Sequence, residues 1–438
     1  MGVLIVLRSP PRWNNKDAQG RGLPVDAEER MAAGLAEVPG VSCSGGAIGI
    51  KRNGQHDAAL FVCEQPSVMA GVFTTNRFRS ACVESALDRL HGGTGVKAVL
   101  VTSGNANAGT GAAGRADTEL LAASLGELLG CRADEVVVLH TGVIGVPLRA
   151  ERFVDKLPAL AASASSSFAA GLTAAKAMMT TDTFAKTAVT SFEADGIHHK
   201  IGGVAKGAGM IHPRLATMIS VLATDATVHP VALQAALQRA VKTTFNAISV
   251  DGDTSPNDSV ILLARSAQFS GAGGQRAASV IREGTQAYES FCTALTEACE
   301  TLARMIIKDG EGATKFIEIR IEGAATEQDA ERVASVVATS PLVKTAFFGE
   351  DFNPGRIVSA IGRAGAEFDW SQLRVAIGGE PVFQNDTFLS VPDATARELM
   401  AQPELIVDIA LGTGACALRF FTCDLTHDYV RINSEYTT

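Results

Sequence analysis

The sequence predicts an α/β fold, because short buried-strand patterns alternate with amphipathic-helix patterns along most of its 438 residues. Residues 58–63 are a continuous apolar run and residues 96–102 are apolar apart from Lys97 and Thr102, as expected of buried strands. Residues 118–129 place four leucines on one helical stripe. These three segments already give the mixture of strands and helices that defines the class.

Three segments in the middle of the chain are predicted to be helices. Residues 151–179 are rich in alanine and serine, and residues 231–245 have apolar side chains at helical spacing. Residues 276–308 form the longest helix candidate. We therefore expect three helices here, the last of which is long enough to cover a sheet.

The last third returns to strands. Residues 317–321 and 405–411 alternate apolar and polar side chains, as in strands with one buried face. Between them, Thr326 and Asp329 predict the capped start of a helix. No repeat of fixed period and no linker of biased composition marks a domain boundary.

The amino-acid composition excludes some classes of function. A hydrophobic fraction of 46% with 19% charged residues is typical of a soluble globular protein. The chain carries 47 acidic and 38 basic residues, a net charge of −9, so it has no general attraction for nucleic acid or for anionic lipid. No apolar run approaches the roughly 20 residues needed to cross a bilayer. We expect neither nucleic acid nor membrane among its partners.

Cofactor and metal motifs are not found. The eight cysteines include no Cys-x-x-Cys pair, which argues against a zinc ribbon or a disulfide framework. The sequence also contains no Walker phosphate loop, no dinucleotide fingerprint and no Gly-x-Ser-x-Gly elbow. We therefore expect no metal and no cofactor.

Four segments are too rich in glycine, threonine and aspartate to be plain core: residues 103–108, 140–145, 179–183 and 205–210. Small residues let backbone amides approach a ligand. Each segment taken alone is more commonly a turn at the end of a strand.

Thr217 is the most interesting nucleophile candidate. A glycine-rich turn and Pro213 bring it to the start of an apolar strand, with the small Ala216 before it. Its hydroxyl could attack the preceding carbonyl and release a chain that begins with Thr217. The new α-amine, with a reference pKa of about 7.7 to 8.0, would then serve as the base for that hydroxyl. An uncut threonine at the start of a strand is the simpler interpretation.

An ordered set of motifs resembles the ornithine acetyltransferase family, whose self-cleaving threonine enzymes are also called bifunctional glutamate N-acetyltransferases. The motifs extend from about residue 45 to the last residue and comprise Thr-Ser-Gly-Asn-Ala-Asn-Ala at 102–108, Thr-Gly-Val-Ile-Gly at 141–145, Met-Thr-Thr-Asp-Thr at 179–183, Lys-Gly-Ala-Gly-Met at 206–210, Ala-Thr-Met at 216–218, Val-Asp-Gly-Asp-Thr at 250–254 with Asn-Asp at 257–258, Lys-Asp-Gly-Glu-Gly-Ala-Thr-Lys at 308–315, Ser-Pro-Leu-Val-Lys-Thr at 340–345 and Asn-Ser-Glu-Tyr-Thr-Thr at 433–438.

The resemblance implies a layered helix–sheet–sheet–helix fold of the N-terminal-nucleophile type, shared with certain aminopeptidases. It implies an N-terminal extension at 1–40, an α chain at 41–216 and a β chain at 217–438, produced by cleavage between Ala216 and Thr217. The two chains are expected to form an α2β2 heterotetramer. The resemblance implies a cytoplasmic location, or the mitochondrial matrix if the protein is eukaryotic.

The implied reaction is a ping-pong transfer of acetyl from N2-acetylornithine to glutamate through an ester on Thr217, in arginine biosynthesis. Acetyl-CoA is a further possible donor. The oxyanion hole falls on Thr141 and Gly142. The implied substrate contacts are Thr180, Lys206, Thr217, Glu311, Asn433 and Thr438. Without the resemblance, Lys206 and Glu311 would be interpreted as ordinary surface charges.

Departures from the family pattern leave alternatives open. Residues 352–354 read Phe-Asn-Pro where the family has a tryptophan after the asparagine, and His140 stands where a small serine is common. Ser255 and Pro256 interrupt another motif. These changes could retune the donor or acceptor site. The alternatives are a related N-terminal-threonine aminopeptidase or amidohydrolase, an acyltransferase for another acylated amino acid, and an uncleaved binding subunit.

Overall fold

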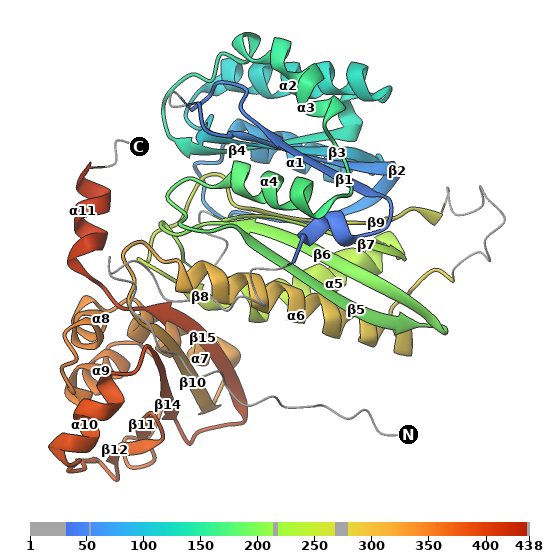
Figure 1. Ribbon diagram of the computed structural model, residues 1–438. Helices are drawn as coiled ribbons and strands as arrows, with labels where there is room; N and C mark the ends of the chain where they lie inside the picture. Colours follow the sequence, from blue (N-terminus) through green and yellow to red (C-terminus); the bar gives the residue numbers. More distant parts are fainter. Residues whose placement is uncertain (1–31, 52–53, 213–217, 268–278, 436–438) are drawn as a thin grey trace.

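The computed structural model describes residues 32–51, 54–212, 218–267 and 279–435, and it confirms the predicted α/β class (Figure 1). Two sheets are each covered by helices. The first is an eight-stranded sheet with the order β4-β3-β2-β9-β7-β6-β5 and β1 paired to β2. Its strands are β1 (Val41–Gly46), β2 (Ala58–Phe73), β3 (Val96–Asn105), β4 (Val136–Val143), β5 (Lys186–Ala194), β6 (Ile197–Lys206), β7 (Ile219–Thr227) and β9 (Ser259–Arg265).

The first sheet folds over on itself along the long strand β2. The pairing of β2 with β3 shifts register between Val62 and Ser67, and from Ser67 to Phe73 the strand pairs with β9. Buried side chains of β3 and β4 share one core with those of β6, β7 and β9. The single sheet therefore supplies both inner layers of the expected helix–sheet–sheet–helix arrangement.

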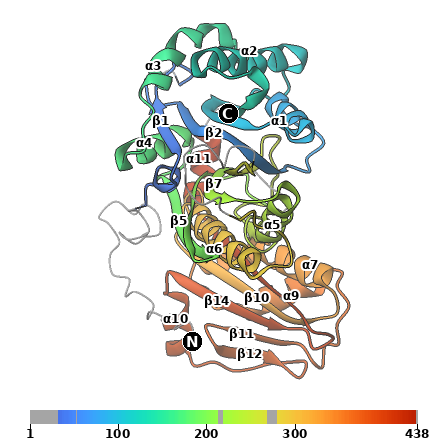
Figure 2. The same ribbon diagram turned by 90° about the vertical axis from the view of Figure 1, so that its right-hand side faces the viewer.

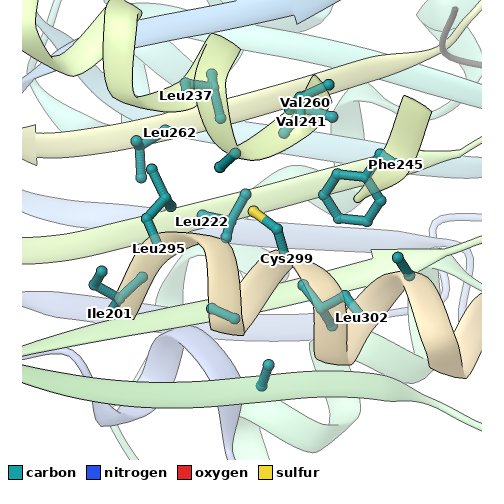
Figure 3. Close-up of a cluster of buried hydrophobic side chains, with 14 of the residues drawn as sticks. Ile201, Leu222, Leu237, Val241, Phe245, Val260, Leu262, Leu295, Cys299 and Leu302 are labelled. Carbon is teal, nitrogen blue, oxygen red and sulfur yellow. The ribbon is translucent and has the colours of Figure 1, made fainter. Parts of the chain in front are cut away.

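The two outer faces of this folded sheet are covered by the helices α2 (Gly111–Leu129), α3 (Leu157–Ala162), α5 (Pro230–Thr243) and α6 (Gln286–Lys308). The helices α1 (Ala81–Gly92) and α4 (Phe168–Met178) contribute buried side chains to the inner core instead. One outer core joins α2 and α3 to β3 and β4. The other joins α5 and α6 to β6, β7 and β9, and Figure 3 shows Leu237 of α5 and Leu295 of α6 gathered around Leu222 and Leu262.

The second sheet has seven strands in the order β13-β12-β11-β14-β10-β15-β8. They are β8 (Ile248–Ser249), β10 (Phe316–Ala324), β11 (Arg374–Ile377), β12 (Glu380–Gln384), β13 (Thr387–Phe388), β14 (Glu404–Ala410) and β15 (Cys416–Cys423). Helices α7 (Glu327–Ala338), α8 (Pro341–Phe348), α9 (Pro354–Gly362) and α10 (Asp393–Met400) pack with it. Figure 2 shows this unit below α5 and α6. After β15 the chain ends in α11 (His427–Glu435), which returns to the first unit.

Several predicted elements are confirmed. The expected strands at 317–321 and 405–411 are β10 and β14, which pair with each other. The expected helix cap is also present, because the Thr326 hydroxyl accepts a hydrogen bond from the Asp329 amide at 3.1 Å. In these segments the local pattern and the tertiary packing agree.

The predicted lengths of two helices are wrong. The helix expected over 151–179 is divided into α3 and α4, because the serine-rich stretch between them bridges to Cys43 and ends with Ser167 capping α4. The helix expected over 276–308 begins only at Gln286, after Gly284 at φ +78° and the cap Thr285. Capping side chains, which the apolar period does not reveal, set both starts.

The segment directly before β1 is packed into the first unit. A short 3-10 helix, Gly34–Glu37, contributes Leu35, which is only 1% exposed, to the inner core. The remainder of the expected N-terminal extension, residues 1–31, lies outside the described residues. Within the described part of the chain, no helix is both long and apolar enough to cross a membrane.

Candidate active site

A cavity of about 90 Å³ lies where the ends of β4 and β6 meet the loops after α4 and α6. Six of the residues expected in the site line it: Thr141, Gly142, Thr180, Lys206, Glu311 and Asn433. The other three, Ala216, Thr217 and Thr438, lie outside the described residues. The structure therefore brings together every expected site residue that it describes.

Gly142 lies in a tightly packed turn of the backbone at the end of β4. Its φ is +133°, and a Cβ there would lie 2.4 Å from the carbonyl carbon of Gly104 on β3. Asn257 fixes the same strand end, since its Nδ2 donates to the carbonyls of His140 at 2.8 Å and Ala106 at 2.6 Å. Only glycine fits this position, which faces the cavity beside Thr141.

Lys206 is a buried cation rather than a surface charge. It is the last residue of β6, and only 2% of it is exposed. Burial lowers the pKa of Lys206, and the nearby carboxylates of Asp182, Asp258 and Glu311 oppose this effect. A buried ammonium at a cavity wall is suited to bind an anionic ligand.

The side chains of Glu311 and Asn433 contact each other at the wall of the cavity. Asn433 of α11 donates from Nδ2 to Oε2 of Glu311 at 2.7 Å, and the Glu311 amide donates to the carbonyl of Ala208 at 2.8 Å. A Cβ on Gly209 would lie 2.4 Å from the Glu311 carboxyl carbon. Small residues before the expected cleavage position thus make room for this carboxylate.

Asp251 secures the loop that follows Gly209. Its carboxylate accepts from the amides of Met210 at 2.5 Å and Ile211 at 3.0 Å. Met210 has a φ of +56°, a conformation that side chains other than glycine rarely adopt. The hydroxyl of Tyr429 donates to the same carboxylate at 3.3 Å, which ties α11 to this loop.

Asp258 lies directly before β9 and contacts the start of β7, on the other side of the expected cleavage position. Its Oδ1 accepts from the Met218 amide at 2.9 Å, whereas its Oδ2 has no hydrogen-bond partner within the described chain. Burial raises the pKa of Asp258 well above its usual range, and the positive charge of Lys206 acts against this. The residue adjacent to Thr217 is therefore held by a fully buried carboxyl group.

The family departures affect the cavity less than expected. Residues 352–354 do not line it, because Pro354 begins α9 and Phe352 packs against the core of the second unit. His140 belongs to β4 and is fully buried, and its Nδ1 lies 2.7 Å from the Thr102 hydroxyl. Only Ser255 among the altered residues reaches the cavity wall. Residues 352–354 therefore do not belong to the described cavity, and their effect on substrate choice stays a prediction.

Sequence reasoning did not assign a role to four side chains that organise the site: Asp182, Asp251, Asn257 and Asp258. All four belong to the recognised motifs, and each accepts or donates bonds to the backbone of a cavity segment. The available signal was their type and spacing, because an aspartate two residues after a threonine commonly binds nearby amides. The partners of Asp251, Asn257 and Asp258 could not be read from the sequence because they lie 40 or more positions away in the chain.

A model of the ArgJ family matches residues 42–438. The chain belongs to the ArgJ family. "Arginine biosynthesis bifunctional protein ArgJ" of Rhizobium meliloti is 44% identical over 412 residues, covering 92% of this chain and 97% of that protein. The ArgJ of Caldanaerobacter subterraneus is 41% identical over 410 residues, covering 92% and 99%. The resemblance to the ornithine acetyltransferase family, of which ArgJ is a member, is confirmed.

Solved ArgJ structures were also found. The ArgJ of Bacillus halodurans is 36% identical, with a TM-score of 0.44, and the match covers 48% of this chain and 96% of that chain. An aminopeptidase of Ochrobactrum anthropi with an N-terminal-nucleophile hydrolase fold is 14% identical, with a TM-score of 0.42, and the match covers 70% of this chain and 91% of that chain.

Proposed function

We propose that this ArgJ protein moves an acetyl group from N2-acetylornithine to glutamate, giving ornithine and N-acetylglutamate for arginine biosynthesis. It would first cleave itself between Ala216 and Thr217 and then carry the acetyl group as an ester on Thr217. One observation carries the proposal. Six residues that the family resemblance assigns to this reaction, from five separate segments of the chain, line one cavity.

Self-cleavage needs a nucleophile, an electrophile and a frame that holds both products. The Thr217 hydroxyl attacks the Ala216 carbonyl carbon, a C–O bond forms, and the peptide C–N bond breaks as the nitrogen takes the hydroxyl proton. Water then hydrolyses the ester, which frees the Ala216 carboxylate and restores the hydroxyl. The frame is supplied by β6 and β7, which lie on either side of the break and pair from Ile201–Thr224 to Lys206–Ile219.

Acyl transfer then uses the new α-amine of Thr217 as the base. The amine takes the hydroxyl proton as the oxygen attacks the acetyl carbon, and it gives the proton to the departing ornithine nitrogen as that C–N bond breaks. The amine of glutamate then attacks the ester and regenerates the hydroxyl. Thr141 and Gly142 are assigned to the oxyanion of each tetrahedral intermediate, where losing one donor typically costs about 10² to 10³ in rate.

The charges at the cavity suit amino-acid substrates. Lys206 is assigned to the α-carboxylate, and Glu311 to a cationic ammonium of ornithine. Asn433 orients Glu311 through their 2.7 Å hydrogen bond, and Thr180 and Thr438 are assigned further orienting contacts. A buried cation and a carboxylate on one small cavity favour a zwitterionic ligand over an apolar one.

The name "bifunctional" of the relatives supports a second activity, for which we infer acetylation of glutamate from acetyl-CoA. We also infer that the two cleaved chains form an α2β2 assembly in the cytoplasm. These inferences rest on the family resemblance.

An isotope-exchange assay tests the proposed reaction. If transfer is ping-pong, the protein incorporates labelled ornithine into N2-acetylornithine without glutamate, and a Thr217→Ala variant does not. Release of acetate without exchange would instead identify an amidohydrolase. Exchange with a different acylated amino acid, but not with N2-acetylornithine, would identify another acyltransferase.

A further inference from the structure

A buried charge cluster lies directly behind the cavity wall and has no role in the mechanism described so far. It consists of Asp182, Lys186 and Asp309, whose side chains are at most about 1% exposed. The Lys186 ammonium donates to Oδ1 of Asp182 at 2.7 Å and to Oδ2 of Asp309 at 2.5 Å. A fully buried lysine between two carboxylates leaves one negative charge in excess.

The cluster joins three segments that carry cavity residues. Oδ2 of Asp182 accepts from the Thr180 amide at 2.9 Å, and Oδ1 of Asp182 accepts from the Gly207 amide at 2.7 Å, next to Lys206. Asp309 ends α6 two residues before Glu311, and it accepts from the Thr183 amide at 3.0 Å. The three loops are therefore held by a single set of hydrogen bonds.

The positive charge of Lys206 interacts with the excess negative charge of this cluster. Burial lowers the pKa of Lys206, and Asp182 is the strongest influence in the opposite direction. Conversely, Lys186 and Lys206 together hold the pKa of Asp182 below its usual value despite its burial. The cluster thus supplies a nearby negative charge that favours the charged form of Lys206.

We propose that Asp182, braced by Lys186 and Asp309, is a positioning residue that keeps the Lys206 ammonium charged and in place for the carboxylate of the amino-acid substrate. The inference rests on the proposed function, because it assumes that Lys206 binds that carboxylate. Asp182 itself does not line the cavity, so it acts through Lys206 and through the Thr180 and Gly207 amides.

The proposal makes the pH dependence of substrate binding the decisive readout. As pH rises, Lys206 loses its proton and its attraction for a carboxylate, so KM rises. The charged groups that act on Lys206 are Asp182, Lys186, Asp258, Glu311 and Lys51. Removing the Asp182 charge lowers the pKa of Lys206 further, which moves the rise in KM to lower pH.

The experiment compares the full-length wild type with Asp182→Asn and Asp309→Asn. KM for glutamate is measured against pH with N2-acetylornithine as donor. We expect Asp182→Asn to shift the rise in KM downward by about one pH unit or more, with a smaller change in kcat. Titration of the substrate's own amine is the same for every variant, so only the difference between variants is used.

Asp309→Asn is the matched control. It removes the same charge from the same cluster, yet Asp309 is not among the main influences on Lys206. It should lower stability and leave the pH of the rise unchanged. Equal shifts in the two variants, or no shift in either, would overturn the proposal.

Lys206→Arg provides a rescue test, because arginine stays charged throughout the range and should abolish the shift that Asp182→Asn produces in the pH dependence of KM. If Asp182→Asn does not fold, Asp182→Ser, which removes the same carboxylate, takes its place in the same measurement. An inactive wild type would contradict the proposed function. An active wild type with unshifted variants would contradict this inference alone.

Discussion

At the residue scale, the fit of Gly142 gives the sharpest test of the oxyanion assignment. A Gly142→Ala change forces a Cβ against the Gly104 carbonyl carbon and strains a φ of +133°. The amide is then displaced from the oxyanion, and we expect kcat to fall by about 10² to 10³. Steady-state rates with folding monitored by circular dichroism make the measurement.

Gly130→Ala is the matched control for this change. Gly130 also has a positive φ, +65°, but it caps α2 and has no atom within 4 Å of the added Cβ. The Gly130→Ala variant should be slightly less stable than the wild type and should keep the wild-type kcat. A Gly142→Ala variant with wild-type kcat would remove Gly142 from the oxyanion hole.

At the same scale, the burial of His140 makes the stability of the folded protein depend on pH. Complete burial lowers the pKa of His140 from 6.5 to about 3, so the folded protein keeps the ring neutral while the unfolded chain protonates it. Stability from this group is complete above pH 6.5 and is lost as pH falls from 6.5 toward about 3.

The measurement is chemical denaturation of wild type and His140→Asn at pH 7 and pH 4.5. The wild type should lose more stability between the two values than the variant does, since all other groups are shared. Equal losses would show that His140 titrates normally in the folded state.

At the element scale, α11 matters because it brings Asn433 to Glu311. We expect Asn433→Ala to raise KM for N2-acetylornithine about tenfold, since a hydrogen bond to a charged group is lost. The Glu311 carboxylate loses its orientation but stays in the cavity, so kcat should change less.

Ser434→Ala on the same helix turn is the control, because its hydroxyl donates to the Arg431 carbonyl and not to Glu311. It should keep the wild-type KM. Comparable effects of the two substitutions would mean that α11 contributes only general stability.

The elements also show what the sequence could and could not predict. Apolar alternation predicted β10 and β14, and the Thr326 cap predicted α7, because these signals are local. The division of residues 151–179 depends on a bridge from Ser165 to Cys43, which no local period contains. The folding of one sheet into two layers likewise depends on a register shift in β2.

The candidate site likewise contains residues that the sequence could predict and residues that it could not. The resemblance of the motifs to the family predicted six cavity residues. One of them is Lys206, which is buried although a lysine would ordinarily be expected on the surface. Asp309 stayed without a role because its contacts with Lys186 and Thr183 lie 123 and 126 positions away in the chain, and Asp182 because its contact with Gly207 lies 25 positions away.

At the scale of the whole molecule, the expected cleavage position lies between two paired strands of one sheet. The β6–β7 ladder and a shared core join both sides. We therefore expect the two chains to elute together in native size-exclusion chromatography and to separate only in denaturant. Separation without denaturant would contradict a core shared between the two chains.

The central claim is that one threonine first breaks the chain and then carries the acyl group. Intact mass spectrometry tests it most directly, with the protein measured alone and after brief exposure to N2-acetylornithine without glutamate. We predict two chains divided at Ala216–Thr217, an added acetyl mass on the second chain only, and a single unmodified chain for Thr217→Ala. A wild-type protein that stays uncut and unacetylated would contradict the account.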